Sequence, residues 1–250
     1  MDGGYSGAIT KGNMMAEKIQ MTEEDIQKGV RSYIVKSIGG IVFYAVLLML
    51  LRGAWNWLWG WVFIALMALA GLIHVLMLLP TNPALLSERS TGIRAYAKKW
   101  DRWVLSIASV LGMVGWIIAP LDIRNGWGPG MSLWLQIGGA VVFALGWALV
   151  LWATYSNAFF TTTVQIKENQ TVYTGGPYRI VRHPGYLGAV LYNLSTGFLL
   201  GSWWAILPCV LSIVVFVVRT ALEDRTLRAE LDGYEAFTQQ TKYRLIPGIW

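Results

Sequence analysis

The sequence predicts an all-α fold, a polytopic membrane helical bundle of about six transmembrane helices with a cytoplasmic, amphipathic C-terminal tail. Of the 250 residues, 55% are hydrophobic and only 14% are charged, which is too apolar for an ordinary soluble domain. Four stretches contain no Asp, Glu, Lys or Arg, and each is about as long as the ~20 residues that cross the hydrocarbon core. They are residues 53–87, 103–121, 125–166 and 183–218.

The apolar runs divide into six expected spans. Two pairs of spans are joined only by the dipeptides Arg52-Gly53 and Gly201-Ser202, so each pair is predicted to be a tight helical hairpin. Tryptophans cluster near the proposed outer ends, where an amphipathic ring suits the headgroup level. The expected spans are 32–51, 54–79, 103–120, 131–155, 184–200 and 203–221.

The basic residues predict the orientation of the chain. Of the 20 Lys and Arg residues, all but Arg52 and Arg124 lie on one side of the proposed spans or in the ends of the spans at that side. Because basic loops stay inside, this side is expected to be cytoplasmic, with both termini. The chain then divides into a polar N-terminal segment (1–30), four membrane helices (31–155) and a C-terminal part (156–250).

Composition also argues against several classes of protein. The net charge of +6 suits a membrane surface, because no basic-aromatic motif accompanies it and nucleic acid is not an expected partner. The lone Cys209 excludes an intramolecular disulfide and a multi-cysteine metal site, and no metal is expected. Residues 1–30 lack the apolar region of a cleavable signal peptide. The segment "GWGPG" at 126–130 follows no strand, so a Rossmann-type cofactor site is not expected.

The polar turn "GPYRIVRHPGYLG" at 176–188 stands directly before the fifth expected span. One interpretation is topological, with Arg179, Arg182 and His183 fixing the span and Pro184 at its first position, where no N–H is needed. The alternative is a binding site, because free N–H groups at a helix N-terminus favour an anionic group such as a carboxylate. The clustered Gly, Pro and Tyr residues favour this second interpretation.

A second polar cluster, residues 219–237, follows the last span and is expected to continue it as an amphipathic helix. The pairs Arg219–Glu223 and Asp224–Arg228 are four residues apart, so ordinary surface ion pairing is one interpretation. Glu223 favours a functional one, because a carboxylate this close to the membrane is costly without a partner or a task. Because the hairpin between the last two spans is short, Glu223 and His183 are expected at the same level of the membrane, where they can face one pocket.

These two clusters, with the closing "YEAFTQQTKYRLIPGIW", resemble the isoprenylcysteine carboxyl methyltransferase family and the related membrane phospholipid N-methyltransferases. The resemblance is strongest over 155–250 and weaker over 82–90 and 98–102, which resemble a cytoplasmic loop of bacterial members. It implies a prokaryotic inner (plasma) membrane enzyme that uses S-adenosyl-L-methionine, with 156–250 as its cofactor-binding core. The family often has Glu-Glu in place of Glu223-Asp224, and Phe-Gly-x-x-Tyr in place of 231–234, which leaves the docking of the tail open.

The resemblance also implies roles for individual residues. Arg182 and Glu223 are the implied catalytic residues, with Arg182 facing the acceptor. The acceptor is lipidic or small and membrane-accessible: an isoprenylcysteine-like carboxylate, a phospholipid amine or a thiol. A carboxylate needs no base, whereas an amine or thiol makes His183 or Glu223 a base candidate. The implied cofactor-binding residues are Tyr178, His183, Pro184, Tyr186, Leu187, Gly188 and Glu223.

Two other classes remain as alternatives. A membrane isomerase or reductase using haem or a nicotinamide would have only His74 and His183 as histidine ligands. A scaffold or channel is disfavoured, because no intramembrane charge lines a path through the bilayer. By position, His74 is expected to face the bundle or the interface rather than to act in catalysis, and residues 157–163 are a candidate for lateral access of a lipid.

Overall fold

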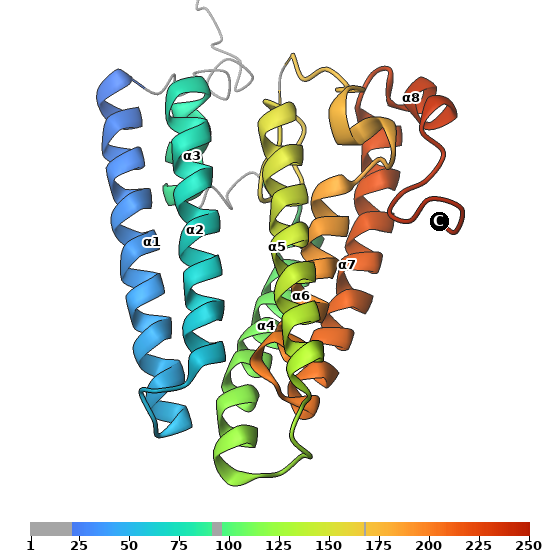
Figure 1. The fold of residues 1–250 in the computed structure, drawn as a ribbon. Coiled ribbons are helices and arrows are strands. Elements are labelled where there is room, and N and C mark those ends of the chain that lie inside the picture. Colours follow the sequence, from blue (N-terminus) through green and yellow to red (C-terminus); the bar gives the residue numbers. More distant parts are fainter. Residues whose placement is uncertain (1–21, 92–96, 168) are drawn as a thin grey trace, which may run out of the picture.

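The computed structural model describes residues 22–91, 97–167 and 169–250. Within these ranges the chain forms helices and no strands, as the sequence predicts (Figure 1). The elements in chain order are α1 (Glu23–Arg52), α2 (Leu58–Thr81), α3 (Pro83–Thr91), α4 (Lys99–Asn125), α5 (Leu133–Ser156), the 3₁₀ helix η2 (Gly176–Arg179), α6 (Pro184–Leu200), α7 (Trp203–Glu230) and α8 (Tyr234–Gln240).

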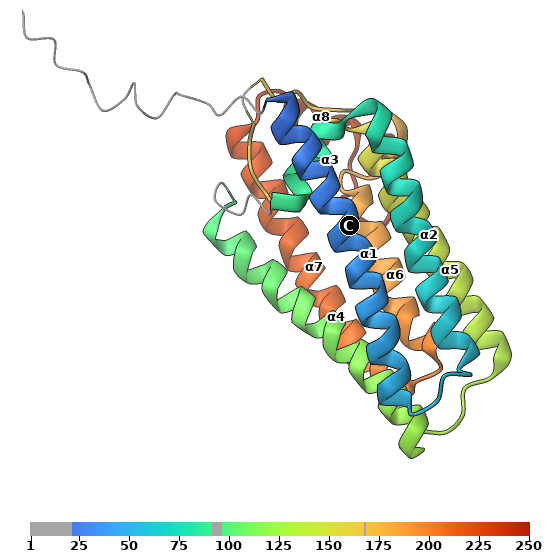
Figure 2. The same ribbon diagram turned by 90° about the vertical axis from the view of Figure 1, so that its left-hand side faces the viewer.

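Six long helices correspond to the six expected spans. Five of them, α1, α2, α4, α5 and α7, are long and apolar enough to cross a membrane. The sixth, α6, has only 17 residues because Pro184 opens it and Gly201 caps it with a φ of 80°. It lies between α5 and α7 in both ribbon views (Figures 1 and 2). The polytopic helical bundle is therefore confirmed.

The six long helices alternate in direction, which gathers the longer connections at one end of the bundle. Residues 157–183, α3 and α8 all lie at this end, called the long-loop end below (Figures 1 and 2). Helix α1 begins here, where the Thr22 hydroxyl accepts a hydrogen bond from the Asp25 N–H at 3.2 Å. The Asp25 carboxylate in turn accepts from the Thr22 N–H, which completes a capping box at the beginning of the helix.

A large apolar cluster joins all six long helices toward the opposite end. Phe63 lies edge-on to both Trp116 and Phe143, with ring centroids 5.5 and 5.4 Å apart. Such edge-to-face packing of aromatic rings stabilises this end of the bundle. The fully or nearly buried members of this cluster are Ala45, Leu48, Met49, Trp57, Phe63, Ile64, Ala119, Phe143, Leu199, Leu200 and Ala205.

Helices α5 and α6 pack closely because glycines face each other across them. A Cβ added to Gly188 would lie 2.6 Å from the carbonyl oxygen of Gly146, and one added to Gly146 would lie 2.8 Å from that of Gly188. Backbone atoms cannot move aside as a flexible side chain can. This contact fixes the position of α6, whose first turn carries the polar residues described below.

Replacing Gly188 with alanine is therefore expected to destabilise the protein by about 1–3 kcal/mol, because the new methyl group overpacks a backbone contact. Thermal unfolding of the detergent-purified protein would measure the change. Gly138→Ala is the matched control on α5, since a Cβ there meets nothing within 4 Å. Equal melting temperatures for the two variants would show that the α5–α6 contact is not tight.

Candidate functional site

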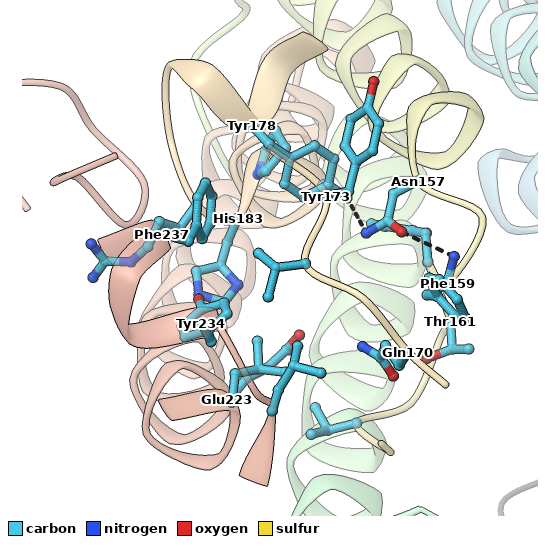
Figure 3. Close-up of a pocket in the computed structure, with 18 of the residues that line it drawn as sticks. Asn157, Phe159, Thr161, Gln170, Tyr173, Tyr178, His183, Glu223, Tyr234 and Phe237 are labelled. Atoms are coloured by element: carbon cyan, nitrogen blue, oxygen red, sulfur yellow. Dashed lines mark hydrogen bonds between the residues drawn. The ribbon is translucent and has the colours of Figure 1, made fainter. Parts of the chain in front are cut away.

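A cavity opens at the long-loop end between the first turn of α6, the end of α7, α8 and residues 157–173. Figure 3 shows its two walls. His183, Tyr234, Glu223 and Phe237 lie on one side, and Asn157, Phe159, Thr161 and Gln170 on the other. The lining is rich in aromatic rings and polar side chains. Its aromatic members are Phe159, Phe160, Tyr173, Tyr178, Tyr186, Tyr234 and Phe237.

The C-terminal tail holds the polar turn in place through backbone hydrogen bonds. The N–H of Arg182 donates to the Tyr243 carbonyl at 2.9 Å, and the N–H of His183 donates to the Arg244 carbonyl at 3.0 Å. His183 is the N-cap residue of α6, and Pro184 is its first residue. The turn, the tail and the beginning of α6 thus form one unit.

Asp224 on α7 joins three arginines from different parts of the chain. Arg182 contacts it through Nε at 2.8 Å and Nη2 at 3.3 Å, and Arg244 through Nε at 2.9 Å. Arg228, one turn further along α7, approaches at 3.3 Å. Asp224 is only 1% exposed. The sequence predicts only the pair with Arg228, so the role of Asp224 in linking the turn to the tail was missed.

Arg182 lines the cavity, but its guanidinium forms hydrogen bonds with other groups of the protein. Besides the contacts with Asp224, its Nη1 atom donates to the carbonyls of Thr241 and Lys242, both at 2.8 Å. The side chain is 4% exposed. The sequence-based interpretation directed Arg182 toward the methyl acceptor. In the structure the guanidinium instead contacts Asp224 and the tail, and no two neighbouring N–H groups remain free to bind an acceptor.

His183 and Tyr234 meet at the same carboxylate. The Tyr234 hydroxyl donates to Asp224 at 3.1 Å, and the His183 Nε2 atom lies 3.4 Å from Asp224 and 3.3 Å from the Tyr234 oxygen. Burial, and then the charge of Asp224, raise the pKa of Tyr234 above its ordinary value, so this hydroxyl stays protonated. The His183 ring stacks on Tyr186 with centroids 5.7 Å apart.

Glu223, the neighbour of Asp224, lines the cavity. Its Oε2 atom accepts a hydrogen bond from the Tyr186 hydroxyl. In the part of the chain that the structure describes, Glu223 has no ion-pair partner. The two adjacent acids therefore have different surroundings, since Asp224 supports the turn and Glu223 borders the cavity.

The ion pair considered between Arg219 and Glu223 does not form. Arg219 instead contacts Asp101 on α4, through Nε at 2.7 Å and Nη2 at 3.1 Å. Its guanidinium also lies 4.8 Å from the centre of the Tyr186 ring, within the range of a cation–π contact. Asp101 is fully buried and accepts a further hydrogen bond from the Val164 N–H at 2.8 Å. This pair thus connects α4, α7 and the loop wall of the cavity.

Asp101→Asn is expected to destabilise the protein by about 3–5 kcal/mol, because it leaves the Arg219 charge buried without a counter-charge. Asp122→Asn is a matched control on the same helix. Asp122 is also buried, but it accepts from neutral donors, the Ser202 hydroxyl at 2.6 Å and the Gly128 N–H at 2.8 Å. Thermal unfolding should show a clearly smaller loss for the control. A larger loss for Asp122→Asn would contradict this assignment.

The structure brings together six of the eight residues singled out from the sequence. Tyr178, Arg182, His183, Pro184, Tyr186 and Glu223 all line the cavity. Leu187 and Gly188 are not part of its lining, and Gly188 packs against α5 instead. Of the loop wall of the cavity, only residues 157–163 were anticipated, and only as a route for a lipid. Within the described residues, no group of three or more His, Cys, Asp or Glu side chains is placed to hold a metal ion.

The placement of His74 agrees with its expected position, since its side chain is buried in the bundle at 4% exposure.

Comparison with known proteins identifies the region around the cavity. No curated protein matches the chain significantly. Residues 134–231 do match a protein family, and they comprise most of α5, the polar turn, α6 and α7. These residues form a domain of the phospholipid methyltransferase family, in agreement with the resemblance seen in the sequence.

Proposed function

We propose that the protein is an S-adenosyl-L-methionine-dependent methyltransferase whose methyl donor binds in the cavity at the long-loop end. The family domain supports a membrane methyltransferase. The observation that carries the proposal is Glu223, a carboxylate that borders an aromatic-lined cavity and has no cationic partner among the described residues. A carboxylate near the membrane is costly unless it has a task, and binding a cationic ligand is such a task.

The lining residues fit this donor chemically. S-adenosyl-L-methionine carries an ammonium group, an adenine ring and a methyl group on a positively charged sulfur. Glu223 would bind a cationic part of it, and the aromatic rings of Tyr178 and Tyr186 offer faces for stacking or cation–π contacts. His183 and Pro184 would contribute from the turn. Arg182, which faces Asp224, is proposed as a positioning residue that keeps this turn in place.

Catalysis in such a site rests on placing the acceptor in line with the methyl group and on excluding water. We propose a lipidic or small membrane-accessible acceptor. A carboxylate acceptor is already ionised near neutral pH. An amine or thiol acceptor has to lose a proton, and Glu223 is then the proposed base, because the His183 Nε2 atom already lies against Asp224 and Tyr234.

The basic residues support a location as well as an activity. Because the connections at the long-loop end carry most of the Lys and Arg residues, we propose that this end faces the cytoplasm, with both termini on that side. The membrane would be the inner (plasma) membrane of a prokaryote. Residues 156–250 would form the cofactor-binding core against α5.

A transfer assay tests the proposal. The detergent-purified protein would be incubated with methyl-labelled S-adenosyl-L-methionine and a membrane lipid extract or a set of small thiols. We expect the label to appear in an acceptor only when the folded protein is present. A folded protein that transfers no label to any of these acceptor classes would overturn the proposed acceptor range, and one that also fails to bind the donor would overturn the activity.

A further inference from the structure

A second polar cluster lies on α3, outside the residues that line the cavity. The Nε and Nη2 atoms of Arg89 are buried and have no hydrogen-bond partner in the part of the chain that the structure describes. The neighbouring acid, Glu88, pairs with Lys167 at 2.7 Å. Nearby, the Lys36 ammonium donates to the Ser90 carbonyl at 2.9 Å. The edge of the Arg89 guanidinium formed by Nε and Nη2 is thus unpaired among the described residues.

This edge is the one that two buried arginines, Arg182 and Arg219, use to hold a carboxylate. Arg182 presents Nε and Nη2 to Asp224, and Arg219 presents the same two atoms to Asp101. The two parallel N–H groups of this edge match the two oxygens of a carboxylate or phosphate. In Arg89 the corresponding edge meets no anion among the described residues. Burial lowers the pKa of Arg89 from its ordinary value and outweighs the opposing effect of the nearby Glu88 charge.

His74 on α2 adds a second unpaired polar atom. Its Nε2 atom is buried and has no hydrogen-bond partner among the described residues, and the charge of Arg89 acts on its ring. The Tyr33 ring of α1 packs beside it with a centroid distance of 6.1 Å. Unpaired buried polar groups are rare in folded proteins, and a bound anion would supply acceptors for both of these residues.

The cluster adjoins the proposed catalytic cavity through one aromatic ring. The Arg89 guanidinium lies 5.9 Å from the centre of the Phe160 ring, and Phe160 lines the cavity. The Cε2 and Cζ atoms of this ring pack on Gly185 in the first turn of α6, where an added Cβ would lie 2.6 Å from each of them. A ligand bound at Arg89 would therefore lie next to the site of methyl transfer.

We propose that Arg89 and His74 form an oxyanion-binding site that takes the carboxylate or phosphate group of the methyl acceptor. Arg89 would bind two oxygens of this anion side-on through Nε and Nη2. His74 would donate a third hydrogen bond to the anion from Nε2. The assignment of this anion to the acceptor rests on the proposed function. The binding of an oxyanion at Arg89 stands on the unpaired atoms alone.

Thermal unfolding in a phosphate-free maltoside detergent tests the site without any methyl donor. Dodecyl phosphate or dodecanoate is expected to raise the melting temperature of the wild type, whereas dodecyltrimethylammonium is not. Arg89→Gln should weaken anion binding at least about tenfold, since it removes charged hydrogen bonds. The exposed Arg102, also at the long-loop end, provides the control variant Arg102→Gln, which should respond as the wild type does.

The outcomes separate the possible sources of the anion. A larger shift with the alkyl anions than with inorganic phosphate indicates a lipid headgroup, and equal shifts indicate a small free anion. No shift of the wild type with any anion, or an equal shift in Arg89→Gln, would overturn the site. Because the assay contains no S-adenosyl-L-methionine, its result is independent of whether the cavity binds the donor.

A second variant keeps the test valid if Arg89→Gln folds poorly. Arg89→Met removes a charge whose Nε and Nη2 atoms are buried without a hydrogen-bond partner among the described residues, so it is expected to raise the melting temperature of the ligand-free protein. It should also abolish the shift with dodecyl phosphate. A marked loss of stability in ligand-free Arg89→Met would show that Arg89 serves the fold and would overturn the proposed site.

Discussion

Replacing Asp224 with asparagine is expected to destabilise the protein by about 3–5 kcal/mol and to abolish methyl transfer. Asp224 is the counter-charge of Arg182, whose side chain is 4% exposed, and it also pairs with Arg244 of the tail. Removing its charge leaves these guanidinium groups without compensation. The polar turn and the tail would then separate from α7, and the cavity would lose its shape. Thermal unfolding and the transfer assay would measure the two effects.

Asp232→Asn is the matched control for this prediction. Asp232 lies in the short connection between α7 and α8, is exposed, and forms no ion pair among the described residues. Its replacement is expected to change stability by less than about 0.5 kcal/mol. Similar melting temperatures for the two asparagine variants would show that Asp224 does not hold the turn and the tail together.

Glu223→Gln is expected to leave the fold intact and to weaken the binding of S-adenosyl-L-methionine by about 10- to 100-fold. The amide has nearly the shape of the carboxylate and still accepts from the Tyr186 hydroxyl, so packing is preserved. It cannot compensate a positive charge, and a hydrogen bond to a charged group contributes about 1.5–3 kcal/mol. Calorimetric titration of the purified variant would give the affinity, and its unchanged melting temperature would confirm that it is folded.

Glu230→Gln on the same helix separates a local effect from a general effect of charge. Glu230 pairs with Lys98 at 2.6 Å on the surface and does not line the cavity. Its replacement should leave the affinity for the donor unchanged. If Glu223→Gln binds the donor as well as Glu230→Gln does, Glu223 does not contact the donor.

The sequence predicts the six long helices well, because each follows from an apolar run bounded by charged residues or Gly and Pro. It does not predict α3. Residues 83–91 are polar and lack a clear apolar period, so this helix depends on tertiary contacts. Ser87 packs on Gly29 of α1 so closely that a Cβ at Gly29 would lie 1.9 Å from its hydroxyl oxygen. Such a contact is not visible in a local pattern.

The candidate site is predicted in part for the same reason. The motif identifies the turn, and helical spacing brings Glu223 near it. Adjacent residues on a helix point in different directions, so the spacing alone could not assign Glu223 to the cavity and Asp224 to the turn. Arg182, the partner of Asp224 in the polar turn, is 42 residues earlier in the chain, and the partner of Arg219 is 118 residues earlier. Pairs this distant are determined by how the helices pack.

Binding of S-adenosyl-L-methionine to the detergent-purified, folded wild-type protein tests the central claim most directly. Calorimetric titration should show saturable binding, and S-adenosylhomocysteine, which has the same adenosine and amino acid groups, should compete for it. A folded wild-type protein that does not bind the donor would contradict the proposed activity. The polar turn would then serve to anchor α6 at the membrane surface.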